Sequence, residues 1–300
     1  MHYLKVAEVI FMPARLEQIQ RGTPDLPFAR YSFHYVTPRH VTANTHWHPE
    51  QEILYVISGS IEVMIGKQPF LISEKQICFV APNVLHSVVT SAPNTVYHAF
   101  VFSYDLLTLP DMHFFQTTIT EPMRKGELIF PAVLDINDSH YPIAAQALDR
   151  ICEYNMNDPG YKLVVFQALV TLYTMLQDTL IPSQGTESSA DNLAVKTCLD
   201  YMREHYAQRI TLEQLARLVH LHPNYLCSLF KTYTGQTAFQ LLIHIRLENA
   251  AALLERGRLS VSQVAILCGF ESVSFFSRKF KQIMGCTPKD YCNHSAKKVY

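Results

Sequence analysis

The sequence lacks the long apolar run that a membrane span requires. Its longest apolar stretch, residues 163–176, is interrupted by polar side chains and falls short of the ~20 residues of a transmembrane helix. The first residues carry Glu8 inside their only apolar run, which excludes the hydrophobic core of a signal peptide. We therefore predict a cytoplasmic protein that does not contact a membrane.

Paired cysteines are also lacking. The seven cysteines are scattered and form no CxxC pair, which is typical of reduced thiols in a cytosolic protein. Charged residues make up only 17% of the chain and hydrophobic residues 48%. This composition excludes a disordered chain and is sufficient for packed cores.

The chain has no basic excess, although most nucleic-acid-binding proteins have one. Its net charge is −1, from 25 basic and 26 acidic residues. The charges are unevenly distributed, however. Residues 1–192 hold 11 Lys and Arg against 19 Asp and Glu, a balance of −8, whereas residues 193–300 hold 14 against 7, a balance of +7. This asymmetry predicts different partners for the two halves.

The charge changes sign at a polar segment. Residues 182–192 read PSQGTESSADN, a composition that is typical of a linker. A length of 300 residues is in keeping with two domains on either side of it. The predicted parts are a β-barrel over 1–140, a helical pair over 141–181, the linker over 182–192, an all-α domain over 193–292 and a tail over 293–300.

The acidic half changes from a strand pattern to a helical pattern. Over residues 28–103, short segments rich in β-branched and aromatic residues recur about every ten residues between turn signals, which predicts a sandwich or barrel. Residues 141–180 have helical periodicity instead. The two apolar stripes are Ile143, Ala147, Ile151 and Tyr154, and Leu163, Phe166, Val170 and Tyr173. We expect this helical pair to form a homodimer interface.

An internal repeat organises residues 193–292. The segment ITLEQLA at 210–216 matches LSVSQVA at 259–265, and apolar, lysine and glycine positions further along match at an offset of 50. Each copy opens with a capping box, in which a hydroxyl and an amide satisfy free backbone N–H groups at a helix start. The capping boxes are Thr211 with Gln214 and Ser260 with Gln263. Each copy predicts a short helix, a turn and a second helix, which is a helix-turn-helix.

The second helix of each copy has an apolar face and a polar face. We expect burial or half-burial of Tyr225, Leu226, Leu229 and Phe230 in the first copy and of Phe275, Phe276 and Phe280 in the second. The outward residues are Asn224, Cys227, Ser228 and Lys231 in the first copy and Ser274, Ser277, Arg278 and Lys281 in the second. Together with the balance of +7, the repeat favours DNA binding over a merely solvated basic face.

Residues 196–292 resemble the DNA-binding domain of the AraC/XylS family of transcription regulators from end to end. The most specific stretch is ILCGFESVSFFSRKFK over residues 266–281, followed by GCTPKDY. Two positions depart from the family pattern. Cys292 stands where the family has Arg, which affects a phosphate contact or ion pair, and His222 stands where the family has a hydroxyl residue that caps the first recognition helix.

The resemblance implies two helix-turn-helix units that insert recognition helices into successive major-groove segments of double-stranded DNA, ~34 Å apart. The positions at which the family reads bases are Asn224, Cys227, Ser228, Ser274, Ser277 and Arg278. Arg278 is the strongest candidate, because Arg pairs bidentately with guanine. Lys231 and Lys281 are interpreted as phosphate contacts, which position the protein without reading sequence.

A histidine-rich motif, HWHPEQEILYVISG, occupies residues 46–59 of the acidic half. His46, His48 and Glu52 share parity, so on an extended chain they face the same side, and His86 is a fourth polar group on a later strand. The spacing resembles the two motifs of the cupin barrel. The first motif fits fully, and the second is degraded at its proline and glycine positions.

These four residues have three open interpretations. Two or three imidazoles and a carboxylate are suited to a divalent transition metal such as Fe(II). Alternatively, the four residues hydrogen-bond the hydroxyls of a small effector, or they are satisfied structural groups at the barrel mouth. Further candidates near the pocket are Arg30, His34, Tyr97 and His98, and Trp47 is assigned to core or rim packing.

The predicted fold class is α+β multidomain, with an N-terminal cupin-like β-barrel plus dimerisation helices and a C-terminal all-α double helix-turn-helix domain. The interpretation that combines these parts is an effector-responsive, sequence-specific, homodimeric DNA-binding regulator, not an enzyme. Its effector is a sugar or another small metabolite, and no cofactor is predicted apart from the divalent metal above. The alternative is a metal-dependent cupin enzyme, a dioxygenase or isomerase, but the C-terminal repeat has no purpose in an enzyme.

Overall fold

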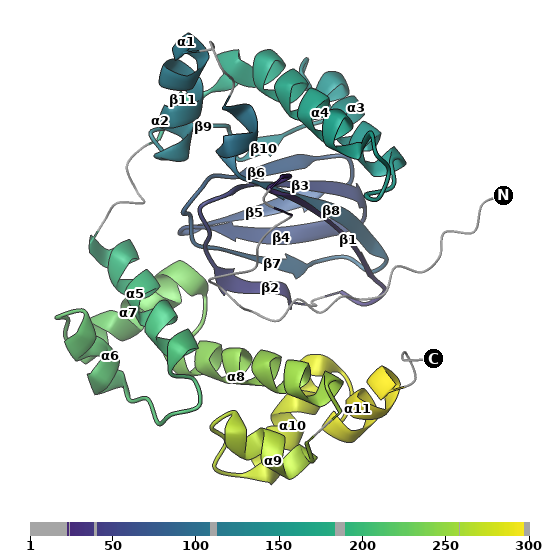
Figure 1. The fold of residues 1–300 in the computed structure, drawn as a ribbon. Coiled ribbons are helices and arrows are strands. Elements are labelled where there is room, and N and C mark those ends of the chain that lie inside the picture. The colour runs from purple at the N-terminus through teal and green to yellow at the C-terminus, as the bar shows by residue number, and fades with distance from the viewer. Residues whose placement is uncertain are drawn as a thin grey trace. The chain divides into compact units, whose positions relative to one another are not determined.

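The computed structural model describes residues 23, 25–38, 41–108, 113–183, 190–257 and 259–296. The chain divides into two compact units, one within Ile19–Ser189 and one from Ala190 onward (Figure 1). Most of the predicted linker, the end of the predicted tail and the first 22 residues lie outside the described residues. Among the described helices, none is long and apolar enough to cross a lipid bilayer.

Two antiparallel sheets form the first unit. The five-stranded sheet has the order β1-β8-β3-β6-β10, and the four-stranded sheet has the order β2-β7-β4-β5 (Figure 1). The strands are β1 Phe28–Tyr35, β2 Val41–His46, β3 Gln51–Ser58, β4 Ser60–Ile65, β5 Gln68–Ser73, β6 Ile77–Val80, β7 His86–Thr90, β8 Thr95–Phe102 and β10 Val133–Leu134. A small sheet pairs β9 Leu128–Ile129 with β11 Ile181–Pro182. These sheets confirm the predicted cupin-like β fold.

Strand β3 is buried on both faces, because successive side chains of a strand point to opposite sides of its sheet. Leu54 and Val56 belong to the apolar cluster that the two sheets enclose. Ile53 and Tyr55 belong to a second cluster, which lies on the outer face of the same sheet. Glu52 has the parity of Leu54, so the strand directs its carboxylate toward the enclosed side.

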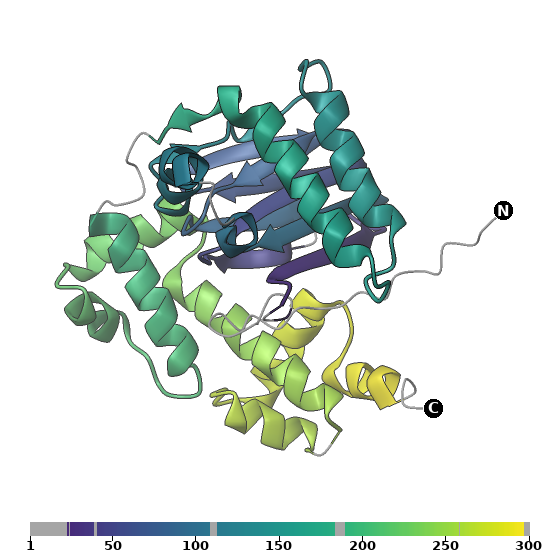
Figure 2. The same cartoon turned by 45° about the horizontal axis from the view of Figure 1, so that its top comes forward.

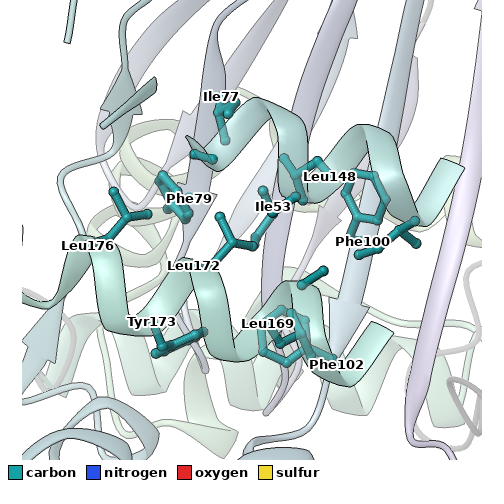
Figure 3. Packing of buried hydrophobic residues seen from close by; sticks show 14 of the residues in the cluster. Ile53, Ile77, Phe79, Phe100, Phe102, Leu148, Leu169, Leu172, Tyr173 and Leu176 are labelled. Atoms are coloured by element: carbon teal, nitrogen blue, oxygen red, sulfur yellow. The ribbon is translucent and has the colours of Figure 1, made fainter. Parts of the chain in front are cut away.

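Two helices, α3 Tyr141–Glu153 and α4 Tyr161–Leu176, cover the outer face of the five-stranded sheet (Figure 2). The contacting side chains include Leu148, Leu169, Leu172, Tyr173 and Leu176 from the helices and Ile53, Ile77, Phe79 and Phe100 from the sheet (Figure 3). Fully burying one such side chain stabilises the fold by about 1.5–3 kcal/mol. The shorter helices are η1 Tyr104–Leu107, α1 His113–Phe115, η2 Gln116–Thr120, α2 Glu121–Arg124 and η3 Gln177–Thr179.

The apolar stripe predicted for α4 is only partly buried. Leu163 is 72% exposed, whereas Val165 and Leu169 are buried. The helix is apolar around most of its circumference, so its periodicity does not single out one face. Half-buried Phe166 continues from Leu163 along the outward side at helical spacing, whereas Val170 packs against the covered cluster, so α4 retains a second apolar surface at Leu163 and Phe166.

The described residues of the second unit form seven helices. These are α5 Ala190–Glu204, α6 Leu212–Leu218, α7 Pro223–Thr234, α8 Ala238–Glu255, α9 Val261–Leu267, α10 Val273–Met284 and α11 Pro288–Ala296. Both predicted capping boxes form at the starts of α6 and α9. The pairs α6–α7 and α9–α10 are the two helix-turn-helix units, and α8 joins them, which confirms the predicted all-α domain.

Two details at the start of α7, the second helix of the first helix-turn-helix, differ from the sequence expectations. Tyr225 was expected to be buried but is 47% exposed, and its hydroxyl donates to both carboxylate oxygens of Asp191 at 3.0 Å. His222 replaces the usual hydroxyl cap, because its Nδ1 accepts the backbone N–H of Asn224 at 3.3 Å. The helix start is therefore capped despite the departure from the family pattern.

Candidate metal centre and nucleic-acid interface

Four titratable side chains converge in the first unit. His46 ends β2 and His86 begins β7, and the two residues are paired in the ladder between these strands. Glu52 is the second residue of β3, and His48 lies in the connection that precedes it. Each residue offers one ligand atom, and these atoms all lie within 4.8 Å of one another. The structure thus brings together the whole set named from the sequence.

Strand parity does not explain this convergence. Strand β2 ends at His46, and residues 47–50 form no strand, so His46, His48 and Glu52 do not share one extended segment. The cross-strand pairing with His86 and the irregular connection between β2 and β3 bring the side chains together instead. The expectation from parity was therefore wrong in its physical reason.

Each of the three imidazoles is oriented by a backbone carbonyl. The Nδ1 atoms of His46, His48 and His86 lie 2.8, 3.1 and 2.9 Å from the carbonyl oxygen of a residue two positions away in the sequence. A carbonyl oxygen only accepts hydrogen bonds, so each Nδ1 carries a proton and donates it. In the neutral imidazole, the lone pair is then on Nε2.

Glu52 faces these nitrogens. Its Oε2 lies 2.8 Å from Nε2 of His86 and 3.3 Å from Nε2 of His48. Burial by itself would raise the pKa of Glu52, but the hydrogen bonds and charges of His48 and His86 outweigh burial and hold the pKa well below its usual value. The carboxyl group is therefore ionised, although it is almost fully buried.

This donor set fits a divalent transition-metal ion. Imidazole nitrogen and carboxylate oxygen are ligands for Fe, Ni, Cu and Zn. A metal-ligating histidine usually donates its other ring N–H to a carbonyl or carboxylate, and all three histidines here do so. A bound cation would also be attracted by the buried negative charge of Glu52.

A buried hydrogen-bond chain connects this cluster with α4. The amide of Gln51 donates to the carbonyl oxygens of Glu52 and Val80 at 3.0 and 2.8 Å. The hydroxyl of Tyr104 donates to Oε1 of Gln51 at 2.9 Å, and that of Tyr173 donates to Tyr104 at 3.1 Å. No sequence pattern marks this chain of hydrogen bonds, because its members are far apart in the sequence. The only local signal is a glutamine at the start of an apolar strand.

Of the further candidates near the pocket, only Tyr97 lies on the enclosed side of the sheets. Arg30 donates to backbone carbonyls at the end of α3, and its guanidinium lies over the ring of Tyr161. His98 bonds a serine of β1, and His34 is exposed. Tyr97 is in the enclosed apolar cluster, where its hydroxyl donates to a threonine of β2 at 2.7 Å. The cluster of four is therefore the candidate site.

The second helices, α7 and α10, carry the predicted DNA contacts. Asn224, Ser228, Lys231, Ser274, Arg278 and Lys281 are exposed, and Cys227 and Ser277 are half-buried. Fully buried Phe230 and Phe276 anchor the opposite faces of these helices. The guanidinium carbon of Arg278 lies 5.8 Å from the ring centroid of Phe275, which supports the cation without covering its donors. All eight side chains can therefore be reached from solvent to some extent.

Both parts of the chain match known families. Residues 215–294 match a helix-turn-helix domain, and residues 33–100 match a cupin domain. The chain is 37% identical over 91 residues to the MmsAB operon regulatory protein of Pseudomonas aeruginosa, a match that covers 30% of each chain. It is 23% identical over 289 residues to the uncharacterized HTH-type transcriptional regulator YdeC of Bacillus subtilis, with 92% of this chain and 94% of YdeC covered.

Among solved structures, ToxT from Vibrio cholerae aligns with a TM-score of 0.48 and 15% identity, covering 88% of this chain and 97% of that chain. The sequence matches place a cupin domain in front of a helix-turn-helix DNA-binding domain, as expected of a transcriptional regulator. These matches agree with the resemblance of residues 196–292 to the AraC/XylS family of transcriptional regulators. These relatives are named as regulators, which favours the regulator over the cupin enzyme.

Proposed function

We propose that this protein is an effector-responsive, sequence-specific DNA-binding regulator whose effector site is the cluster of His46, His48, Glu52 and His86. The observation that carries the proposal is the combination in one chain of a repeated helix-turn-helix and a buried, ionised carboxylate among three oriented imidazoles. The predicted cytoplasmic location is part of the same proposal, because the DNA partner is found there.

On DNA, α7 and α10 act as the two recognition helices. Asn224, Cys227, Ser228, Ser274, Ser277 and Arg278 read base edges. Arg278 is the most specific reader, because its fork of donors matches the two acceptors of guanine in the major groove. Lys231 and Lys281 neutralise phosphates, which gives affinity that depends on salt but not on sequence.

We propose a divalent transition metal as the occupant of the barrel site, rather than a sugar bound directly. A sugar hydroxyl brings no positive charge to the ionised carboxylate of Glu52, and it cannot accept the lone pairs of three imidazole nitrogens at once. The residues that follow the ligands on the same faces, Leu54 and Val56 after Glu52 and Val88 after His86, belong to an apolar cluster. Apolar walls of this kind give a sugar few hydrogen-bond partners. The metal would supply charge, and the chain's own residues hold and orient it.

We propose that the protein acts as a homodimer through the outward apolar side of α4. Leu163 and Phe166 are neighbours there, and the same helix is tied to the barrel site by the chain of Tyr173, Tyr104 and Gln51. A change at Glu52 therefore has a physical route to the dimer surface. An effector shifts such an equilibrium only if it binds one arrangement better than the other.

The DNA part of the proposal is tested by comparing Arg278→Ala with Lys281→Ala. DNA sites are first selected from a random duplex library with the wild-type chain, and binding is measured at several salt concentrations. Arg278→Ala should weaken binding to the selected site by ~1–3 kcal/mol and leave random DNA unaffected, because it removes a base contact. Lys281→Ala should weaken both and reduce the salt slope by about one, as a lost phosphate contact does. An equal loss on both DNAs for Arg278→Ala would remove it from the base-reading set.

A further inference from the structure

Three segments of the second unit meet at one junction, which we call the Arg246 junction. The side chain of Arg246, on α8, donates from Nε to the carbonyl oxygen of Tyr206 at 2.7 Å and from Nη2 to that of Gln208 at 2.8 Å. Both carbonyls belong to the connection between α5 and α6, which leads into the first helix-turn-helix. The guanidinium carbon also lies 5.8 Å from the ring centroid of Phe270, in the turn of the second helix-turn-helix.

A glycine completes the Arg246 junction. Gly269 precedes Phe270 in the turn between α9 and α10 and has a φ of +78°. A Cβ at this position would lie 2.7 Å from the carbonyl oxygen of Ala207 and 2.9 Å from that of Tyr206. These are backbone atoms, so no flexible side chain could move aside. The turn of the second helix-turn-helix therefore packs directly against the backbone that leads into the first helix-turn-helix.

The connecting helix α8 alone would not hold the two helix-turn-helix units in this fixed arrangement. At its ends, α8 adjoins turns at Gly235 and Gly257, both of which have positive φ, and the chain could pivot at such turns. The two hydrogen bonds of Arg246 are made by a charged donor, which makes them roughly twice as strong as neutral ones. The Arg246 junction thus adds a second connection, besides α8, between the two helix-turn-helix units.

We propose that Arg246 and Gly269 are positioning residues that lock the two helix-turn-helix units into one rigid body and so set the spacing of the DNA half-sites. This inference rests on the proposed function of α7 and α10 as recognition helices. Inserting one base pair between half-sites moves the second site by about 3.4 Å and rotates it by about a tenth of a turn. A rigid pair of helices cannot follow that change, whereas a hinged pair can.

The experiment measures binding of the full chain to the selected site and to versions with one base pair inserted or deleted between its half-sites. Wild type should lose about tenfold in affinity on either change, similar to the loss caused by a mismatched base pair. Arg246→Met keeps the length and apolar stem of the side chain but removes both donors. It should bind the original spacing more weakly and lose less than about threefold on the spacing changes.

Arg256→Met is the matched control, because Arg256 lies exposed at the end of the same helix and should leave the spacing preference unchanged. Gly269→Ala is the second variant and should relax spacing in the same direction as Arg246→Met. The inference is overturned if both variants keep the wild-type ratio between spacings, or if wild type itself tolerates the changes. Failure of wild type to select any DNA sequence would contradict the proposed function instead, and the inference would fall with it.

A measurement on wild type alone checks the geometry without DNA and without a variant that could fail to fold. Residual dipolar couplings of the amides in α6–α7 and in α9–α10 should fit a single alignment tensor. Two different tensors would mean that the units move independently, and this result would overturn the rigid junction even if DNA binding is specific.

Discussion

Replacing Glu52 with glutamine should abolish stabilisation by a divalent metal and leave the metal-free protein folded. The amide has the shape of the carboxylate but no charge, and its N–H can donate to Nε2 of His86, which lies 2.8 Å from Oε2 in the wild type. The variant loses the attraction between the carboxylate and the imidazoles of His48 and His86 but can keep a hydrogen bond to them, so stability without metal should fall only slightly. If Glu52 were merely structural, added metal would stabilise neither the wild type nor the variant.

The size of the metal effect follows from linkage. An ion present at ~100 times its Kd stabilises the folded state by ~2.7 kcal/mol. The ligands all belong to the unit within Ile19–Ser189, and for a domain of that size each kcal/mol corresponds to roughly 2–4 °C in Tm, or about 5–11 °C in total. If Glu52→Gln weakens affinity by about 100-fold, only ~0.4 kcal/mol remains at the same concentration, a shift of about 1–2 °C.

The assay is thermal unfolding of the full chain after treatment with a chelator, with and without added Mn(II), Fe(II), Ni(II) or Zn(II). Glu62→Gln is the matched control, because Glu62 is exposed on β4 of the same domain and should retain the full shift. Two results would refute the reasoning: a Glu52→Gln protein that keeps the shift, or a wild-type protein that none of the metals stabilises.

Two further predictions concern the helices. Thr211→Ala or Ser260→Ala should each lower the free energy of unfolding of the second unit by about 1 kcal/mol, because each removes one half of a capping box; urea denaturation measures the loss, and an unchanged midpoint for both would contradict it. Leu163→Glu should convert the dimer to a monomer in sedimentation at micromolar protein, because it puts a charge in the middle of the proposed apolar interface. Lys162→Glu, at an exposed neighbouring position, should remain dimeric, and dimers in both variants would exclude this face.

The sequence was informative where local patterns decide the structure. Regularly spaced β-branched segments predicted the two sheets, and the repeated capping boxes predicted the starts of α6 and α9, because a cap needs only residues within one helical turn. The four residues of the barrel site were named from the spacing of a known motif. Their convergence depends on the pairing of β2 with β7, which no local pattern encodes.

Other features were not predictable, because they depend on contacts between distant segments. The stripe through Leu163 fits either face of an apolar helix, and only packing on the sheet decides which face is buried. Tyr225 has the size and apolarity of a core residue, but its hydroxyl finds Asp191, 34 positions earlier. Arg246 bonds carbonyls 40 and 38 positions earlier, and backbone carbonyls carry no sequence signal.

The most direct test of the account is the DNA affinity of the full chain with the barrel site loaded and with it emptied by chelation, measured at one salt concentration on a DNA site selected from a random library. Coupled binding sites typically change each other's affinity by about 5–150-fold. We expect a change of that size in wild type and none in Glu52→Gln. Equal affinity of the loaded and emptied wild-type protein, with metal binding verified on the same sample, would contradict the claim that the barrel controls the DNA-binding domain.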